Sequence, residues 1–217
     1  MCRVQHGRNA MGLFDIFRQR PPIRDAAALT TFIDENAAML VQRGIYEYAR
    51  ARAGVYAKIL FTEKAFLDSI EFSRWRAYPL GLAMVAELTE GILRPHWPHL
   101  RHELTAELRV LTLDAFDRYD IPPSIGASGW GDVREELARL LDHIGLHAPK
   151  PAKDIPEPFA ERYFDLMPIH ERLRALDFPS VHAYLKVSLC NMHDELSRRL
   201  DPKALLAGWE RRAVASA

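Results

Sequence analysis

The sequence contains few cysteines, no net charge and no long apolar run. Its 217 residues include two cysteines, which excludes the disulfide framework of small secreted domains and favours a reducing, cytoplasmic environment. The 29 basic residues are balanced by 29 acidic ones. Because nucleic-acid binding needs a basic footprint, we expect no nucleic-acid partner. The longest apolar run, Leu80 to Ala86, is much shorter than the roughly 20 residues of a membrane-spanning helix, so we expect no transmembrane segment.

Complete catalytic motifs are also missing. The G-x-S-x-G nucleophile elbow fails at Gly126–Trp130, because its last position is tryptophan rather than glycine. The phosphate-binding loop, the H-E-x-x-H zinc motif and the paired Glu-x-x-His motifs of di-metal bundles do not occur. These absences favour a non-catalytic role.

Helical periodicity is present almost throughout. Apolar residues recur at helical spacing after Asp25, a residue suited to cap a helix, and Gly44 predicts a stop or a kink. The run 80–93 is apolar on nearly every side, which is typical of a central buried helix. Because no alternating strand pattern occurs, we predict an all-α protein, a compact bundle of about seven to eight helices.

Several helix boundaries follow from prolines and capping residues. Pro79 predicts a kink or a new helix start, and a break is expected near Phe178-Pro179. A helix is predicted over 99–116. The turn-forming residues of 119–131 predict a loop, followed by a helix that starts at Asp132.

The distribution of prolines predicts the domain organisation. We expect an N-terminal extension (1–24), a main helical bundle (25–146), an extended proline-rich connector (147–157) and C-terminal helices that pack on the bundle as an arm (158–217). Within the extension, apolar residues of 11–17 are followed by three arginines. This segment is either a weak contact with an anionic membrane surface through residues 11–24 or a short helix that ties the N-terminus to the core.

Arginines interleaved with aromatic residues form the first candidate site. Tyr48 and Arg52 lie one helical turn apart, and Arg74, Trp75 and Tyr78 follow at the end of the next apolar segment. Guanidinium groups among aromatic rings bind a carboxylate or phosphate through forked hydrogen bonds and stacking. The alternative is that these arginines merely cover core aromatic residues at the surface.

Carboxylates and histidines provide two further candidates. Glu87 is included among the ligand-binding candidates, and it lies three residues from Glu90 on the apolar run. The two carboxylates are therefore either buried with charged partners or aligned on one solvated stripe of the helix. The last candidate is a cluster of possible metal ligands, which consists of His96, His99, His102 and Glu103. His99, His102 and Glu103 are expected to share one helix, and the alternative is simply a polar helix start.

Together these observations predict a cytoplasmic, all-helical binding or assembly protein, such as an adaptor, without a cofactor. We expect a protein partner or self-association, or a small anionic ligand in the arginine and aromatic pocket. The alternative function is a helical metal- or haem-dependent oxidoreductase or a small hydrolase, for which the histidine cluster is the motivation.

Overall fold

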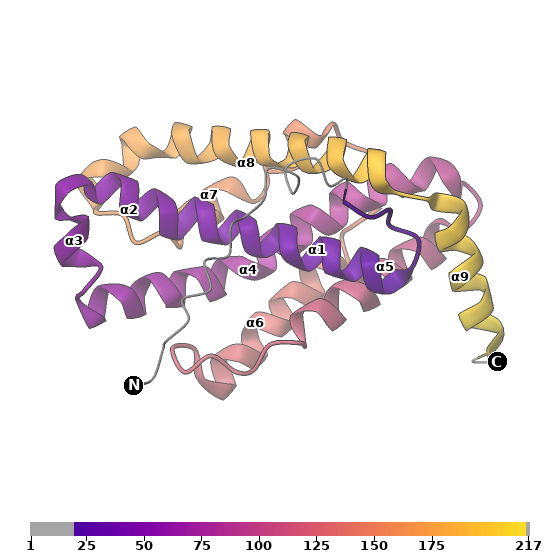
Figure 1. The fold of residues 1–217 in the computed structure, drawn as a ribbon, viewed down its shortest axis with the longest axis horizontal. Helices are drawn as coiled ribbons and strands as arrows, with labels where there is room; N and C mark the ends of the chain where they lie inside the picture. The colour runs from indigo at the N-terminus through magenta and orange to yellow at the C-terminus, as the bar shows by residue number, and fades with distance from the viewer. Residues whose placement is uncertain (1–19, 216–217) are drawn as a thin grey trace, which may run out of the picture.

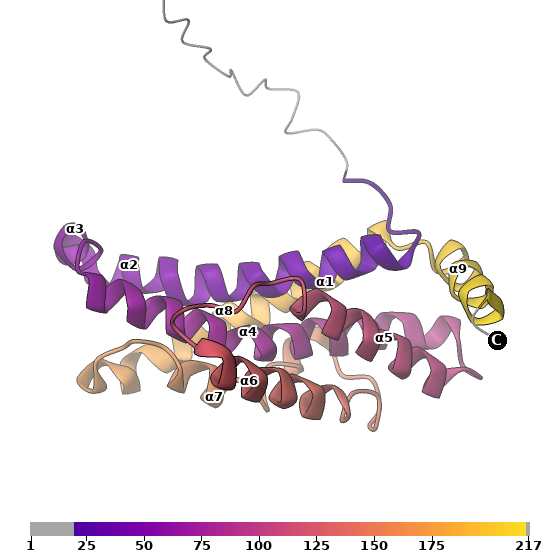
Figure 2. The ribbon, with the colours of Figure 1, turned by 90° about the horizontal axis from the view of Figure 1, so that it is seen from below.

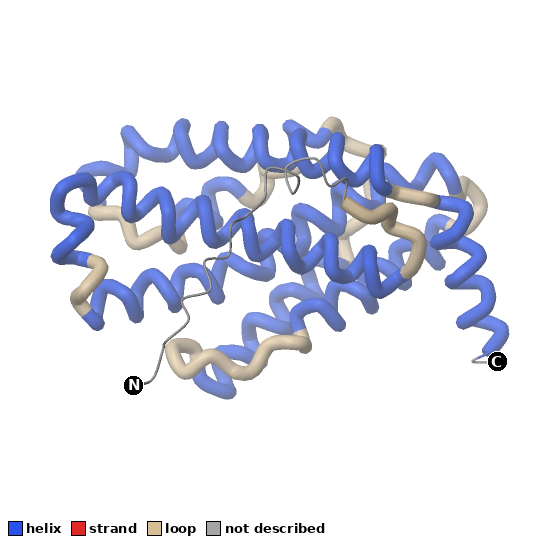
Figure 3. The backbone as a smooth tube through the Cα atoms, viewed as in Figure 1, coloured by secondary structure: helices blue, strands red, loops and turns tan. Residues whose placement is uncertain are grey.

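The structure is a computed structural model that describes residues 20–215, except for the side chains of residues 171, 173, 175 and 210–215. The predicted all-α class is confirmed (Figure 3): in residues 20–215 there is no strand, and Ile23 and Leu200 form an isolated parallel bridge. Most of the 11–24 segment, for which we considered membrane contact, lies outside the described residues.

The two longest helices run roughly along the long axis of the molecule, whereas the C-terminal helix turns away from this axis at one end (Figure 1). In chain order the α-helices are α1 (Ala26–Val41), α2 (Tyr48–Ala53), α3 (Ala57–Leu60), α4 (Lys64–Leu93), α5 (Arg101–Phe116), α6 (Gly126–Leu141), α7 (Ala160–Asp165), α8 (Glu171–Arg199) and α9 (Pro202–Ala215). Shorter turns connect them: a π-helix, η2 (Gln42–Glu47), and the 3-10 helices η3 (Gly54–Tyr56), η4 (Arg94–His96) and η5 (Ala152–Asp154). Within residues 20–215, no helix combines the length and the apolar character needed to cross a bilayer.

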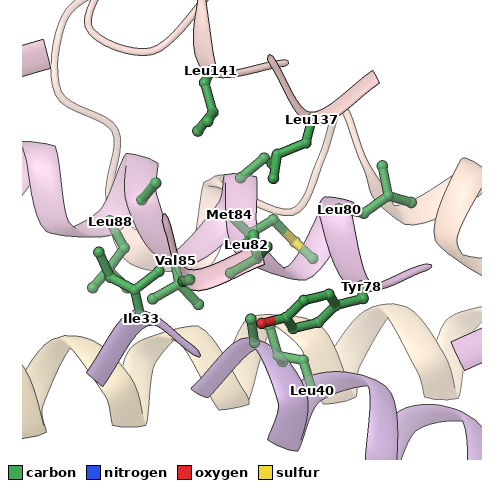
Figure 4. Packing of buried hydrophobic residues seen from close by; sticks show 14 of the residues in the cluster. Ile33, Leu40, Tyr78, Leu80, Leu82, Met84, Val85, Leu88, Leu137 and Leu141 are labelled. Carbon is green, nitrogen blue, oxygen red and sulfur yellow. The ribbon is translucent and has the colours of Figure 1, made fainter. Parts of the chain in front are cut away.

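Helix α4 is the centre of the bundle. Every residue from 77 to 90 is buried, and the helix packs against α1, α5, α6 and α8. Figure 4 shows Ile33 and Leu40 of α1 on one side of α4, with Leu137 and Leu141 of α6 on the other. The layered arrangement is also visible in Figure 2, where α4 lies between α1 and α6. The expected central buried helix is therefore confirmed.

Two prolines lie inside helices instead of ending them. Helix α4 continues through Pro79, and α8 continues through Pro179. A proline removes one backbone hydrogen bond from a helix, but Pro79 is buried and its neighbours pack on all sides. At Pro79 this packing overrides local propensity, so the new helix start predicted there is wrong. The break predicted near residue 179 is also wrong, because α8 continues through Pro179, which is exposed.

Gly44 marks a local change of helix type. The stop or kink expected there takes the form of the π-helix η2, which continues α1 into α2. A Cβ on Gly44 would lie 2.3 Å from the Tyr163 hydroxyl oxygen and 2.8 Å from Cε1 of Tyr184. The Tyr163 hydroxyl donates to the Leu40 carbonyl oxygen at 2.8 Å. Glycine thus allows α7 and α8 to approach the end of α1.

Other boundaries differ from the predictions by a few residues. Asp25 caps α1 as expected, because its carboxylate accepts from the Ala28 N–H at 2.8 Å. Helix α6 begins at Gly126, so Asp132 lies inside the helix and does not start it. The stretch 147–157 is not fully extended, since it includes η5 and the buried Ile155 and packs against α8.

Candidate functional site

Arg52 and Tyr78 of the predicted arginine and aromatic pocket have separate carboxylate partners within the chain, whereas Nε of Arg74 is buried without a hydrogen-bond partner in the described residues. On α2, Arg52 Nε lies 3.0 Å from both carboxylate oxygens of Asp177 on α8. Burial and the nearby Asp177 carboxylate raise the pKa of Tyr48. The guanidinium of Arg52 therefore already has a carboxylate from the protein itself.

Arg74, Trp75 and Tyr78 do line a common cavity, together with Tyr119, but its volume is about 70 Å³. Ligand pockets typically have roughly 300–1,000 Å³. The hydroxyls of Tyr78 and Tyr119 donate to Oδ1 of Asp34 at 2.6 and 2.8 Å. This part of the fold fits the alternative reading, in which arginine covers core aromatic residues.

Burial and the hydrogen bonds to Asp34 determine how these tyrosines titrate. Burial, followed by the hydrogen bond to Asp34, raises the pKa of Tyr119 to about 12. The same two causes raise the pKa of Tyr78 above its usual range. Both hydroxyls therefore remain protonated donors at neutral pH, and Asp34 supplies the anion that the sequence pattern assigned to a ligand.

The candidate metal ligands do not converge. His96 lies in η4, and His99 precedes α5, which begins at Arg101, so the expected placement of His99 on that helix is wrong. His102 and Glu103 are exposed. Among residues 20–215, no group of three or more histidine, cysteine, aspartate or glutamate side chains is arranged to hold a metal ion.

Glu90 is buried with a charged partner. It is 1 % exposed, and Arg94 Nε and Nη2 donate to its two carboxylate oxygens at 2.7 and 2.6 Å. Nη1 of Arg94 donates to the carbonyl oxygen of His147 at 2.8 Å. The reading in which Glu87 and Glu90 lie on a solvated stripe is therefore wrong.

Glu87 is the second buried carboxylate of α4, with 8 % of its surface exposed. Its Oε1 lies 3.0 Å from Lys150 Nζ and 3.3 Å from His147 Nε2. The other ring nitrogen of His147, Nδ1, lies 2.9 Å from the Ala148 carbonyl oxygen. Both partners come from the stretch between α6 and α7, which thus closes over the C-terminal part of α4.

Gly145 makes this approach possible. Its φ of 79° lies in the left-handed region, where glycine is favoured. A Cβ at this position would lie 2.6 Å from Cγ2 of Thr105 and 3.4 Å from Oε1 of Glu90. The chain turns here against α4 and α5, and His147 and Lys150 follow directly.

Two cavities meet at the pair formed by Glu87 and Lys150. The larger has a volume of about 430 Å³ and the smaller about 210 Å³, and both are lined by this pair. We call the two cavities the Glu87 groove. Besides the pair, its lining residues are Leu80, Leu88, Gly91, Ile92, Leu140, His143, Ile144, Leu146, His147, Pro149, Ala152, Ile155, Pro158, Phe159, Arg162 and His193.

Apolar side chains and basic groups dominate this lining. Lys150, Arg162 and three histidines stand against one carboxylate, that of Glu87. Arg162 also forms an ion pair with Glu136, which does not line either cavity. The arrangement suits a ligand that combines an apolar body with an anionic group.

Of the residues that line the groove, the sequence singled out Glu87 as a ligand-binding candidate. His147 and Lys150 were missed because their segment was read as a connector, although two buried carboxylates on an apolar helix already required cationic partners from elsewhere. No family model matches this sequence, and no curated protein or solved structure is significantly similar to it.

Proposed function

We propose that this chain is a non-catalytic binding protein whose Glu87 groove holds an amphiphilic ligand with an apolar body and an anionic head. The observation that carries the proposal is the basic and apolar lining of the cavity of about 430 Å³ beside Glu87 and Lys150. This volume falls within the roughly 300–1,000 Å³ of typical ligand pockets, which are mainly apolar with a few polar groups that orient the ligand.

Lys150 is the residue best suited to hold the anionic head. An ammonium group has three N–H donors, and in the described part of the chain Glu87 is the partner found for it. With 31 % of its side chain exposed, Lys150 retains donors that face the groove. The ion pair with Glu87 thereby holds the ammonium against α4 and leaves N–H donors for a ligand.

Arg162 provides a second positive charge on the same cavity. Its Nη2 is paired with Glu136, and a guanidinium has five N–H donors in a planar fork. The apolar body would lie against Leu140, Ile144 and Phe159, which line the cavity beside these charges. Charge and shape thus favour a carboxylate or sulfonate with a hydrocarbon or aromatic body.

A displacement assay tests this proposal with defined probes. Anilinonaphthalene sulfonate, an apolar anion, is bound to the full chain and then displaced by dodecanoate, dodecanol or dodecyltrimethylammonium. We expect dodecanoate to displace the dye at the lowest concentration, because it alone offers an anionic head to Lys150. Equal displacement by all three probes, or no dye binding, would contradict the proposal.

A pair of variants locates the binding. The double variant Glu87→Gln/Lys150→Met removes the ion pair without leaving a buried charge unpaired, and we expect it to weaken dodecanoate binding by about tenfold. The control is Lys153→Met, because Lys153 is an exposed lysine of the same stretch that lines neither cavity. If both variants lose affinity equally, the binding depends on overall charge and not on the groove.

The contact between His147 and Glu87 favours one alternative, a small hydrolase. A histidine Nε2 at 3.3 Å from a carboxylate oxygen beside a ligand-sized cavity is the arrangement of a general acid–base pair. Hydrolysis of 4-nitrophenyl butyrate by the unaltered chain and by His147→Gln tests it. His143→Gln is the control, because His143 lines the same cavity but has no carboxylate partner in the described part of the chain. Turnover that only His147→Gln abolishes would replace the non-catalytic proposal.

A further inference from the structure

An exposed apolar cluster lies at one end of the bundle, at the turn between α2 and α3. Val55, Tyr56 and Ile59 are 85 %, 67 % and 60 % exposed. We call these three residues the apolar tip. Large apolar side chains that gather on a surface usually mark an interaction site.

The backbone turn at Gly54 and the aromatic packing of Phe61 support the apolar tip. Gly54 turns the backbone with a φ of 53°, and a Cβ there would meet no atom within 4 Å. Below the tip, the ring of Phe61 packs edge-to-face on Tyr46 and on Phe66, with centroid distances of 5.1 and 5.3 Å. In Figures 1 and 2 the α2–α3 turn forms a corner at the end of the molecule. The apolar side chains therefore stand on an ordered, convex projection.

Basic residues accompany the apolar tip. Residues 43–64 include five basic and two acidic residues, in a chain whose net charge is zero. Arg52 and Lys64 are paired with Asp177 and Asp68. Arg50 and Lys58 are exposed, and no ion-pair partner is found for either in the described part of the chain. With Asp177 and Asp68 counted beside Glu47 and Glu63, the five basic residues leave a net charge of +1, and Arg50 and Lys58 are the basic residues next to the tip in the sequence.

We infer that the apolar tip inserts into the surface of an anionic lipid bilayer. Shallow insertion places apolar side chains roughly 5–10 Å into the boundary between headgroups and acyl chains. Tyrosine is enriched at this depth, and Lys58 and Arg50 would then meet anionic headgroups. This inference does not depend on the ligand proposed for the Glu87 groove.

A lipid surface suits the tip better than a folded protein partner. A stable protein interface usually covers about 800 Å² on each partner, whereas the tip offers three side chains on a convex corner. A fluid bilayer can adapt its shape to such a projection. The unpaired basic residues add an electrostatic attraction to anionic lipids, which three apolar side chains alone would lack. The small area of the tip and the unpaired Arg50 and Lys58 beside it therefore favour an anionic lipid surface.

Sedimentation with lipid vesicles tests the inference on the full chain. The vesicles consist of phosphatidylcholine alone or of phosphatidylcholine with phosphatidylserine. We expect binding to the anionic vesicles that decreases with salt, because exposed charges are screened. Lys58→Glu should reduce the partition coefficient more than fivefold, since each basic residue near the surface contributes about fivefold.

Two matched variants separate the tip from apolar surface in general. Val55→Ser/Tyr56→Ser/Ile59→Ser should lower vesicle binding at least about tenfold. Leu176→Ser/Val187→Ser removes exposed apolar side chains of α8, which are 72 % and 60 % exposed, and should leave binding unchanged. Circular dichroism of each variant establishes that the helices are retained.

A fluorescent label reports the position of the tip directly. In a chain with Cys2→Ser and Cys190→Ser, the change Val55→Cys allows one nitrobenzoxadiazole label, whose emission should shift to the blue when anionic vesicles are added. Absence of binding, or binding that the triple tip variant retains, would overturn the inference. If the triple variant instead dissociates an oligomer seen by sedimentation velocity, the tip is a protein contact and the lipid assignment is wrong.

Discussion

Lys150 Nζ lies 3.0 Å from Oε1 of Glu87 and thereby joins the segment between α6 and α7 to the C-terminal part of the central helix α4. His147 contacts the same oxygen, and its carbonyl accepts from Arg94, which holds Glu90. These contacts link two buried carboxylates and three basic residues in one network. Buried ion pairs contribute little net stability, so a position beside two cavities favours a role in binding.

The first prediction concerns the buried pair of Arg94 and Glu90. Arg94→Met should lower the free energy of unfolding by about 3–5 kcal/mol, because it leaves the Glu90 carboxylate buried without its partner. Urea denaturation measures the change. Arg139→Met is the matched control, since Arg139 also pairs with a glutamate four residues earlier but both side chains are exposed, at 67 % and 76 %. We expect the control to change stability by less than about 1 kcal/mol.

A double variant tests whether the loss of stability comes from the unpaired Glu90 carboxylate or from the methionine side chain itself. Glu90→Gln/Arg94→Met removes both charges and should recover part of the lost stability. Equal losses for Arg94→Met and Arg139→Met would mean that Glu90 is not buried as described.

The second prediction compares two helical glycines. Gly44→Ala should destabilise the fold by about 1–3 kcal/mol, since its Cβ would displace Tyr163, whose ring is fully buried. Gly91→Ala adds the same methyl group to α4 where no atom lies within 4 Å, so a gain of about 0.5–1 kcal/mol from helix propensity is expected. The midpoints of thermal unfolding of the two variants should shift in opposite directions, and an unchanged or raised midpoint for Gly44→Ala would exclude the close approach at Gly44.

The third prediction concerns stability at alkaline pH. The pKa of Tyr119 and that of Tyr184 are both raised to about 12, mainly by burial, whereas unfolded tyrosine titrates near 10. The folded state therefore holds these protons more tightly. The resulting stabilisation is complete below about pH 10 and is lost as the pH rises through about 12.

Tyr119→Phe should reduce this pH dependence. Each titrating group contributes at most about 1.4 kcal/mol per pH unit, so the variant should lose stability less steeply than the unaltered chain. Urea denaturation at a series of pH values from neutral upward measures both slopes. Identical slopes would show that the Tyr119 hydroxyl is accessible to solvent and does not hydrogen-bond to Asp34.

The core helix could be predicted from the sequence because its signal is local. The apolar run 80–93 has no polar side except Glu87 and Glu90, and it is the centre of the fold. The new helix start predicted at Pro79 is wrong because the free energy of a single lost hydrogen bond is outweighed by burial around the whole helix. The start of α1 could be predicted because the side chain of Asp25 caps it. The start of α6 at Gly126 has no side-chain cap, so the sequence does not indicate it.

The candidate site depended on contacts between distant parts of the chain. Arg52 and Asp177 are 125 residues apart, and Tyr78 and Asp34 are 44 apart. Periodicity places a residue on a helix face but does not identify its partner. The arginine and aromatic pattern therefore predicts an anion pocket, whereas Asp177 and Asp34 of the chain already contact Arg52 and Tyr78.

Methyl NMR with a spin-labelled fatty acid tests the central proposal, ligand binding in the Glu87 groove, most directly. A doxyl-labelled dodecanoate bound beside Glu87 and Lys150 should broaden the methyl signals of Leu140, Ile144 and Leu146, which line the larger cavity. The methyl signals of Val187, an exposed residue of α8 that lines neither cavity of the groove, should be unchanged. Broadening of the methyl signals of the groove, with those of Val187 unchanged, is the result we predict, whereas uniform broadening, or none, would contradict binding in this groove.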